Sequence, residues 1–189
     1  MINRSLVRLW FVLFGFFPLL ASATPPQGEE TFDQDAIVKD ADQFFGQTTE
    51  GLAKLIEKSF REKGRPNGYI KGEEVAGAIG VGLRYGSGDL IMKGGAARKV
   101  YWTGPSVGFD LGGDATKVFV LVYHLPSANA IFQRYPGVDG SLYFIGGAGI
   151  NYQQLGDVIL APIRLGVGLR EGASVGYMHY TPEKTWNPF

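Results

Sequence analysis

The sequence predicts a mainly β protein: a small antiparallel β-barrel of about eight to ten strands with two short helices near its N-terminus. The chain has 28 glycines in 189 residues, about twice the usual share, and 13% of its residues are aromatic. Many short segments alternate apolar with small or polar residues, which indicates strands with two unlike faces. Glycine, aromatics and this alternation together are typical of curved antiparallel sheets. A barrel or a sandwich would suit strands at this spacing, and closure would remove exposed edges.

The first residues have the pattern of a secretory signal. Arg4 and Arg8 precede an apolar run, Leu9–Leu20, which ends at Ala21-Ser22-Ala23, an A-x-A cleavage pattern. The apolar run is shorter than the roughly 20 residues that a membrane span needs. We therefore expect a signal peptide over residues 1–23, a flexible leader over 24–32 and a single domain over 33–189. This predicts a periplasmic protein with no transmembrane segment in its mature chain.

Two helices are expected before the strands begin. The first covers about Asp33–Phe45, with an aspartate cap and Gly46 at its end. The second covers about Glu50–Lys63, with a threonine cap and Gly64 at its end. Both have the apolar stripe of helices that pack on a sheet.

The central stretch is Val100–Leu125, which predicts two strands around the turn Gly112-Gly113-Asp114. Before it, Val75–Tyr85 alternates, with one face of alanine and glycine that allows close approach or sharp bending. A hairpin is expected around Gly94-Gly95. The later expected strands are Ser141–Tyr152, Asp157–Arg164, Leu165–Leu169 and Ala173–Tyr180.

Composition excludes several functions. The chain has no cysteine, so disulfides, thiol catalysis and thiolate metal sites are absent. Lysine plus arginine equals aspartate plus glutamate at 18 each. A general nucleic-acid or anionic-membrane binder should be more basic. We expect no nucleic-acid partner and no cofactor.

Three long runs carry a family resemblance: PNGYIKGEEVAGAIGVGLRYGSGDL (Pro66–Leu90), VYWTGPSVGFDLGGDATKVFVLVYHLPSANAIFQRYPGVDGSLYFIGGAGI (Val100–Ile150) and the ending TPEKTWNPF. They resemble the EipA family of alphaproteobacterial periplasmic proteins. The resemblance implies a small antiparallel β-barrel with a polar interior pocket and a role in cell-envelope integrity. It implies no catalytic activity and no catalytic residues. The glycine pattern is more distantly similar to the SYLF (Ysc84-type) lipid-binding domain.

A serine-hydrolase pattern is also present. Gly104-Pro105-Ser106-Val107-Gly108 fits G-x-S-x-G, followed by Asp110 or Asp114 and then His124 or His179 in hydrolase order. The nucleophile elbow needs a strand, a sharp turn and a helix, whereas here another strand follows. We interpret Ser106 as a strand residue, and the two histidines as structural rather than metal ligands, because no short ligand spacing joins them.

The candidate ligand-binding residues are Arg84, Asp110, Arg164 and Arg170. Arg84 falls on the small-residue face of its strand. If that face lines the barrel, its guanidinium would meet Asp110 or an anionic ligand, since the arginine fork binds both oxygens of a carboxylate or phosphate. The alternative is surface exposure or internal salt bridges. Glu73-Glu74 is interpreted as a solvated turn pair, because neighbouring strand residues point to opposite faces.

The sequence therefore favours a non-enzymatic periplasmic protein. It would bind an anionic envelope component, a lipid or glycan, in a polar barrel pocket and support envelope integrity. The alternatives are a protein-binding envelope scaffold with an exposed aromatic patch around Trp102 or Trp186, and a hydrolase that uses Ser106.

Overall fold

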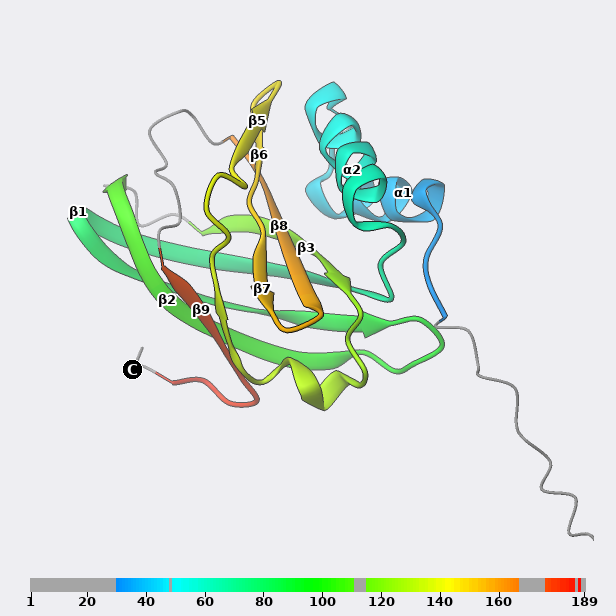
Figure 1. The fold of residues 1–189 in the computed structure, drawn as a ribbon. Helices are drawn as coiled ribbons and strands as arrows, with labels where there is room; N and C mark the ends of the chain where they lie inside the picture. The colour runs from blue at the N-terminus through cyan, green and yellow to red at the C-terminus, as the bar shows by residue number, and fades with distance from the viewer. Residues whose placement is uncertain (1–29, 48, 111–114, 167–175, 186, 188–189) are drawn as a thin grey trace, which may run out of the picture.

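The computed structural model of the chain describes residues 30–47, 49–110, 115–166, 176–185 and 187, with the backbone alone at 77–81 and 106–110. Two helices lie on one side of a strongly curled sheet of nine strands (Figure 1). The strands are antiparallel in every pair, which confirms the mainly β fold class and the two N-terminal helices. No helix in the described part of the chain has the length and hydropathy of a membrane span.

The helices are α1 (Gln34–Phe45) and α2 (Glu50–Lys63). The strands are β1 (Gly68–Met92), β2 (Arg98–Asp110), β3 (Thr116–Tyr123), β4 (Arg134–Pro136), β5 (Tyr143–Ile145), β6 (Ala148–Ile150), β7 (Gln153–Leu155), β8 (Val158–Leu165) and β9 (Tyr177–Thr181), and a 3-10 turn covers Ala128–Ile131.

The helices begin and end where the caps predict. The Asp33 carboxylate accepts a hydrogen bond from the Ala36 N–H at 2.9 Å, and the Thr49 hydroxyl accepts one from the Leu52 N–H at 3.1 Å. Gly46 ends α1 with φ of +76°, a conformation that glycine adopts without steric cost. Capping thus satisfies backbone groups that the helix itself leaves without partners.

The sheet nearly closes into a ring. Its strand order is β4-β9-β2-β1-β3-β8-β6-β5, with β7 also paired to β8. An isolated bridge between Gly137, just after β4, and Gln153 of β7 links the two ends of the curled sheet, and the Val138 N–H donates to the Tyr152 carbonyl beside it. Seven strands therefore surround the interior, while β5 and β6 extend beyond the ring beside α2 (Figure 1).

The long strand β1 folds back so that its two halves face each other. Residues 68–74 pair with β3 and residues 78–90 pair with β2. A Cβ on Gly72 would lie 2.5 Å from the Ser87 carbonyl oxygen, and one on Gly88 would lie 2.5 Å from that of Lys71. Only glycine permits this approach at both positions, which sets the curvature of the barrel wall.

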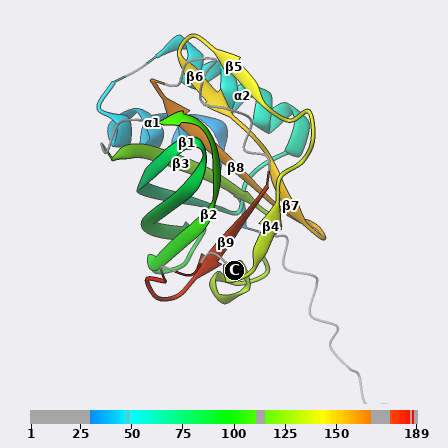
Figure 2. The ribbon, with the colours of Figure 1, turned by 90° about the vertical axis from the view of Figure 1, so that its left-hand side faces the viewer.

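Two apolar clusters lie on opposite faces of the sheet. The barrel interior holds Ile70, Leu90, Val100, Trp102, Val118, Val120, Val122, Leu125, Ile131, Tyr135, Leu160, Met178 and Tyr180. The outer cluster packs α1 and α2 against β1, β3, β6 and β8, as the view turned by 90° also shows (Figure 2). Two polar contacts fix the helices: Tyr69 donates to Asp40 at 2.5 Å, and Ser59 shares a 2.7 Å hydrogen bond with Tyr123.

Two expected strands differ from those observed. The expected Ser141–Tyr152 strand is wrong as one element, because Gly146 and Gly147 take φ of +55° and +79° and turn the chain between β5 and β6. The boundary expected between Arg164 and Leu165 is also wrong, since β8 continues from Val158 to Leu165. The later part of the Leu165–Leu169 segment, residues 167–169, lies outside the described residues, as do 173–175 of the last expected strand.

We predict that Gly86→Ala destabilises the fold. A Cβ on Gly86 would overlap the indole of Trp102, which is buried between the two halves of β1. Such overpacking costs about 1–3 kcal/mol, measurable as a lower free energy of unfolding in urea. Gly95→Ala is the matched control, because its Cβ would lie 3.4 Å from the Met92 Cβ, an ordinary contact. Equal losses in the two variants would contradict this account of Gly86.

Candidate functional site

A buried ionic cluster lies inside the barrel, centred on Glu74, which is 4% exposed. The Arg164 guanidinium binds both carboxylate oxygens, with Nε at 2.5 Å from Oε1 and Nη2 at 3.2 Å from Oε2. Arg84 Nε lies 3.4 Å from Oε1, and the Trp102 indole N–H donates to Oε2 at 3.2 Å. Glu74 is therefore bound by groups from β1, β2 and β8.

The strand registers bring these side chains together. Residues 70, 72 and 74 of β1 share the inward face of the sheet with Trp102 of β2. Arg164 of β8 is paired with Val118 of β3, and because Val118 points inward, Arg164 does so as well. Asn151 fixes Arg164 from the other side, because its Oδ1 accepts a hydrogen bond from Nη1 at 3.2 Å. A guanidinium group that is hydrogen-bonded on two sides has little rotamer freedom, so the cluster is rigid.

The environment keeps Glu74 ionised. Burial by itself would raise the pKa of this carboxyl, but the charges of Arg164 and Arg84 and the hydrogen bonds from Arg164 and Trp102 outweigh burial and lower the pKa to about 2. The cluster is thus an ion pair and not a neutral hydrogen-bonded group at any physiological pH.

The sequence analysis placed Glu74 wrongly. It interpreted Glu73-Glu74 as a solvated turn pair, but only Glu73 is exposed, and Glu74 faces the interior. The available signal was the alternation from Gly68 through Ile70 and Gly72, which places Glu74 on the buried face. The distant partner Arg164, 90 residues away, had no local signal.

The four candidate ligand residues are only partly brought together. Arg84 and Arg164 both lie inside the barrel, and the carboxylate that they meet is Glu74. Asp110 ends β2 opposite Ala78, and only its backbone is described. Arg170 lies outside the described residues. Whether these residues bind a ligand stays a prediction.

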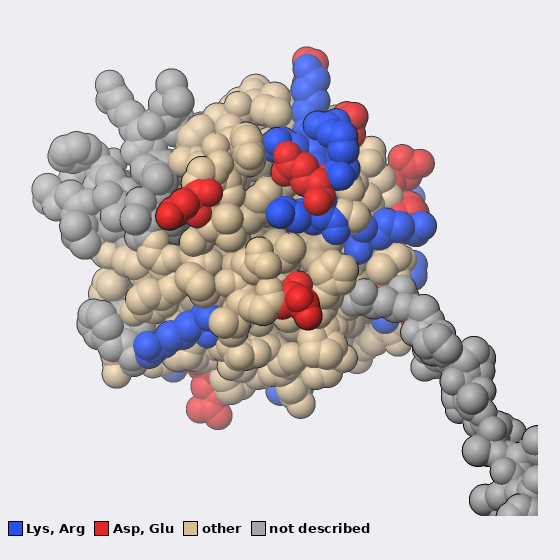
Figure 3. Space-filling view, in the orientation of Figure 1, with Lys and Arg blue, Asp and Glu red and all other residues tan. Residues whose placement is uncertain are grey.

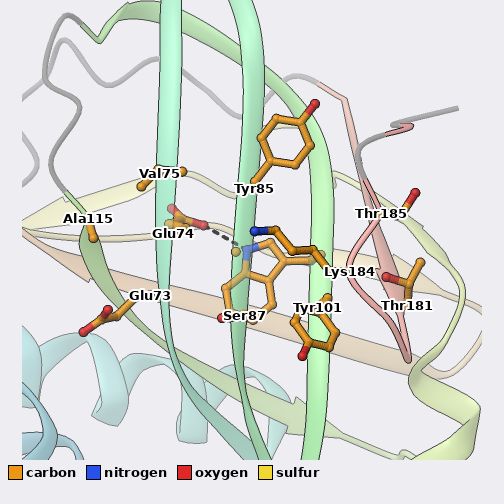
Figure 4. A pocket seen from close by; sticks show the side chains of 12 residues that line it. Glu73, Glu74, Val75, Tyr85, Ser87, Tyr101, Ala115, Thr181, Lys184 and Thr185 are labelled. Atoms are coloured by element: carbon orange, nitrogen blue, oxygen red, sulfur yellow. Dashed lines mark hydrogen bonds between the residues drawn. The ribbon is translucent and has the colours of Figure 1, made fainter.

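A cavity of about 300 Å³ adjoins the cluster at Glu74 (Figure 4). It is lined by residues 73–75 and 85–87 of β1, by residues 101 and 102 of β2, by Ala115 just before β3, and by the end of β9 with residues 184 and 185 that follow it. The lining residues are Glu73, Glu74, Val75, Tyr85, Gly86, Ser87, Tyr101, Trp102, Ala115, Thr181, Lys184 and Thr185. Figure 4 shows Lys184 extending from the C-terminal segment towards β1 and β2. The cavity is at the small end of the usual size of ligand pockets.

Neither Ser106 nor the two histidines occupy a position typical of a catalytic or metal-binding site. Ser106 lies within β2 opposite Gly82, with strand on both sides, which differs from the strand–turn–helix context of a nucleophile elbow. His124 is exposed, with φ of +55°. His179 lies on β9 opposite Thr103 and Arg134, and burial together with the Arg134 charge lowers its pKa. In the described segments, no three metal-ligating side chains gather at one place.

The aromatic patch that a scaffold role would need does not involve Trp102. This residue is 3% exposed, packed against Tyr180 and hydrogen-bonded to Glu74, so the expectation that it contributes to an exposed patch is wrong. Trp186 lies outside the described residues.

These features define a small β-barrel-like protein with an ionic cluster in its interior and a cavity beside that cluster. The model of the EipA family, envelope integrity protein A, matches residues 30–189, and the chain belongs to this family. The chain is also similar to a crystal structure described as a beta-barrel-like, uncharacterized protein from Brucella abortus. That match has 43% sequence identity and a TM-score of 0.78, and covers 84% of this chain and 99% of the other. No curated protein matches the chain.

We predict that Glu74→Gln destabilises the protein by about 3 kcal/mol or more at pH 7, because it leaves two guanidiniums buried around a neutral amide. The cluster stabilises the fold fully above about pH 4.5, the ordinary glutamate value, and that contribution is lost as the pH falls towards about 2. The difference in free energy of unfolding between the wild type and the variant should therefore shrink at pH 3 relative to pH 7.

The exposed neighbour provides the control. Glu73→Gln should change stability by less than about 0.5 kcal/mol, as is usual for surface substitutions. A deficit in Glu74→Gln that is the same at pH 7 and pH 3 would show that charge is not what Glu74 contributes.

Proposed function

We propose that this EipA-family protein is a non-enzymatic periplasmic binding protein for an anionic component of the cell envelope, a lipid or a glycan. The observation that carries the proposal is the contact between the cavity and the ionic cluster at Glu74. Arg84 and Arg164 contact Glu74, which lines the cavity, and Lys184 is itself a lining residue. Charges inside a protein are screened less than exposed ones, so they act strongly on a ligand in the cavity. The N-terminal pattern of a cleaved signal supports the periplasmic location.

A binding role is favoured over a catalytic one by the composition of the cavity. None of the described residues that line it is a histidine. A hydroxyl nucleophile needs a neighbouring base. The fold also keeps the Glu74 carboxylate ionised and held by three partners, which suits a fixed electrostatic wall better than a group that exchanges protons.

The visible surface does not favour binding to a membrane through its charge. In the face drawn in Figure 3, the basic and acidic side chains gather together over α2. They form ion pairs along that helix, between Lys54 and Glu50 at 2.5 Å, between Arg61 and Glu57 at 3.5 Å, and between Lys58 and Glu62. A lipid surface is attracted by a patch of one sign, and the mixed charges over α2 do not form such a patch.

The proposal predicts a bound ligand in protein purified from its own periplasm without denaturation. Native mass spectrometry should show a discrete added mass that is released on unfolding. Arg84→Ala should reduce the occupied fraction, because it removes one of the two guanidiniums behind Glu74. Lys99→Ala is the control, since Lys99 forms an exposed pair with Asp89 on the surface.

The folded state of each variant is checked by circular dichroism before the masses are compared. An unchanged occupied fraction in folded Arg84→Ala would remove Arg84 from the site. A clean mass for the wild-type protein would contradict a ligand that is retained in the cavity.

A further inference from the structure

Most of the cavity beside Glu74 faces outwards, because the side chains that line it lie mainly on the outer face of the sheet. Trp102 belongs to the interior cluster, and side chains alternate along a strand, so Tyr101 points to the opposite face. The β1 residue paired with Tyr101 is Ser87, and Tyr85 lies two residues before Ser87 on the same face. This part of the cavity, the outer groove, therefore runs over β1 and β2, with the segment after β9 along one side (Figure 4).

Much of the polar lining already has partners within the chain. Glu74 is held by two guanidinium groups and an indole N–H. Thr181 donates its hydroxyl hydrogen to the Glu183 carbonyl at 2.7 Å, and the Thr185 hydroxyl accepts from the Asn187 N–H at 3.2 Å. A ligand gains little from polar groups that must first give up such hydrogen bonds. The remaining lining surface is mainly apolar, which favours an apolar ligand.

An exposed apolar strip continues from the outer groove along β1. Val75 lines the groove and is 42% exposed. Leu83, which is 37% exposed, lies two residues before Tyr85 on the same face and opposite Pro105 of β2. The sequence from Val75 to Leu83, VAGAIGVGL, contains no charged or hydrogen-bonding side chain. Exposed apolar surface that is continuous with a groove marks a place where an apolar molecule binds.

One cationic side chain lies over this apolar surface. Lys184 is the lysine among the described residues that line the groove, and Figure 4 shows it extending from the C-terminal segment towards β1 and β2. In the same view Glu73 points away from the other lining side chains. An ammonium group beside an apolar groove can pair with an acidic group while the rest of the ligand lies against apolar side chains.

We propose that the outer groove binds the acyl chain of a single-chain anionic lipid, with the acidic headgroup at Lys184. This inference rests on the proposed function, because it names the class of ligand for the same cavity. A volume of about 300 Å³ is at the small end for ligand pockets and suits one acyl chain rather than two. A chain longer than the groove would continue over the exposed strip at Leu83.

The test uses the mature protein and isothermal titration calorimetry. The probes are dodecanoate and lauroyl-lysophosphatidylglycerol, each below its critical micelle concentration. Dodecyl maltoside offers a chain of the same length on a neutral headgroup, and trigalacturonate is an acidic glycan without a chain. We expect dodecanoate to bind more tightly than dodecyl maltoside. From octanoate to decanoate to dodecanoate, the affinity should rise by up to about fourfold for each methylene that the groove buries.

The first variant makes the groove more polar with little change in shape. Val75→Thr should weaken dodecanoate binding about threefold to tenfold, because a hydroxyl group replaces a methyl group against the chain. Val138→Thr is the matched control, since Val138 is 40% exposed and is not among the described residues that line the cavity. It should bind dodecanoate as the wild type does.

The second variant tests the headgroup contact. Lys184→Gln should weaken dodecanoate binding about twofold to fivefold, the range of an exposed ion pair, and leave dodecyl maltoside binding unchanged. Lys99→Gln is the control, because Lys99 forms its exposed pair with Asp89. Circular dichroism shows that each variant is folded before its affinity is measured.

The outcomes separate this inference from the proposed function. Binding of either anionic lipid that weakens in Val75→Thr and Lys184→Gln, but not in their controls, supports it. Equal affinity in Val75→Thr and Val138→Thr overturns the placement of the chain in the outer groove, and equal affinity in Lys184→Gln and Lys99→Gln overturns the headgroup contact. Binding of trigalacturonate without binding of any chain overturns the lipid inference and leaves the proposed function standing. No binding of any probe also overturns the lipid inference, and the native mass of the purified protein then decides the proposed function separately.

Discussion

The contact between the two halves of β1 at Gly72 and Gly88 controls the shape of this barrel. The strand pairs with β3 through its first half and with β2 through its second, so its curvature sets the angle between the two walls. A methyl group at either glycine would separate the halves, because the opposing carbonyl oxygens lie too close. Separation would move Arg84 away from Glu74 and open the space in which Trp102 is buried. The backbone approach, the ionic cluster and the cavity beside it are consequences of one fold-back.

Burying the ionic cluster costs free energy of desolvation, and its contacts across three strands indicate why the fold tolerates it. Ions lose their hydration when they enter a protein interior, and a hydrophobic replacement of the same volume is often as stable. Here the guanidinium of Arg164 is held by Glu74 and Asn151, and the carboxylate is held by Arg164, Arg84 and Trp102. The network joins β1, β2 and β8 across the interior, so it selects one register of the neighbouring strands β1 and β2 relative to β8, which is distant in the sequence.

The sequence predicted the local elements well and the distant contacts poorly. Both helices follow from caps and apolar stripes that lie within one stretch of chain, and α2 has the predicted bounds, Glu50–Lys63. Arg84 was expected on the small-residue face, and it does lie inside the barrel. Glu74 was missed because the cost of burying it is offset by an arginine 90 residues later, and no local pattern reports such a pair. The turn at Gly146-Gly147 was missed although its two positive φ angles suit the Gly-Gly pair that occupies it.

The single bridge between Gly137 and Gln153 makes the barrel wall unequal around its circumference. Elsewhere the neighbouring strands are joined by continuous ladders, as between β1 and β2, and a ladder opens only when many hydrogen bonds break together. At the bridge, by contrast, a local fluctuation needs to break few backbone contacts between β4 and β7. This junction is therefore the part of the wall where we expect amide hydrogens to exchange with solvent by local opening, while the continuous ladders stay closed.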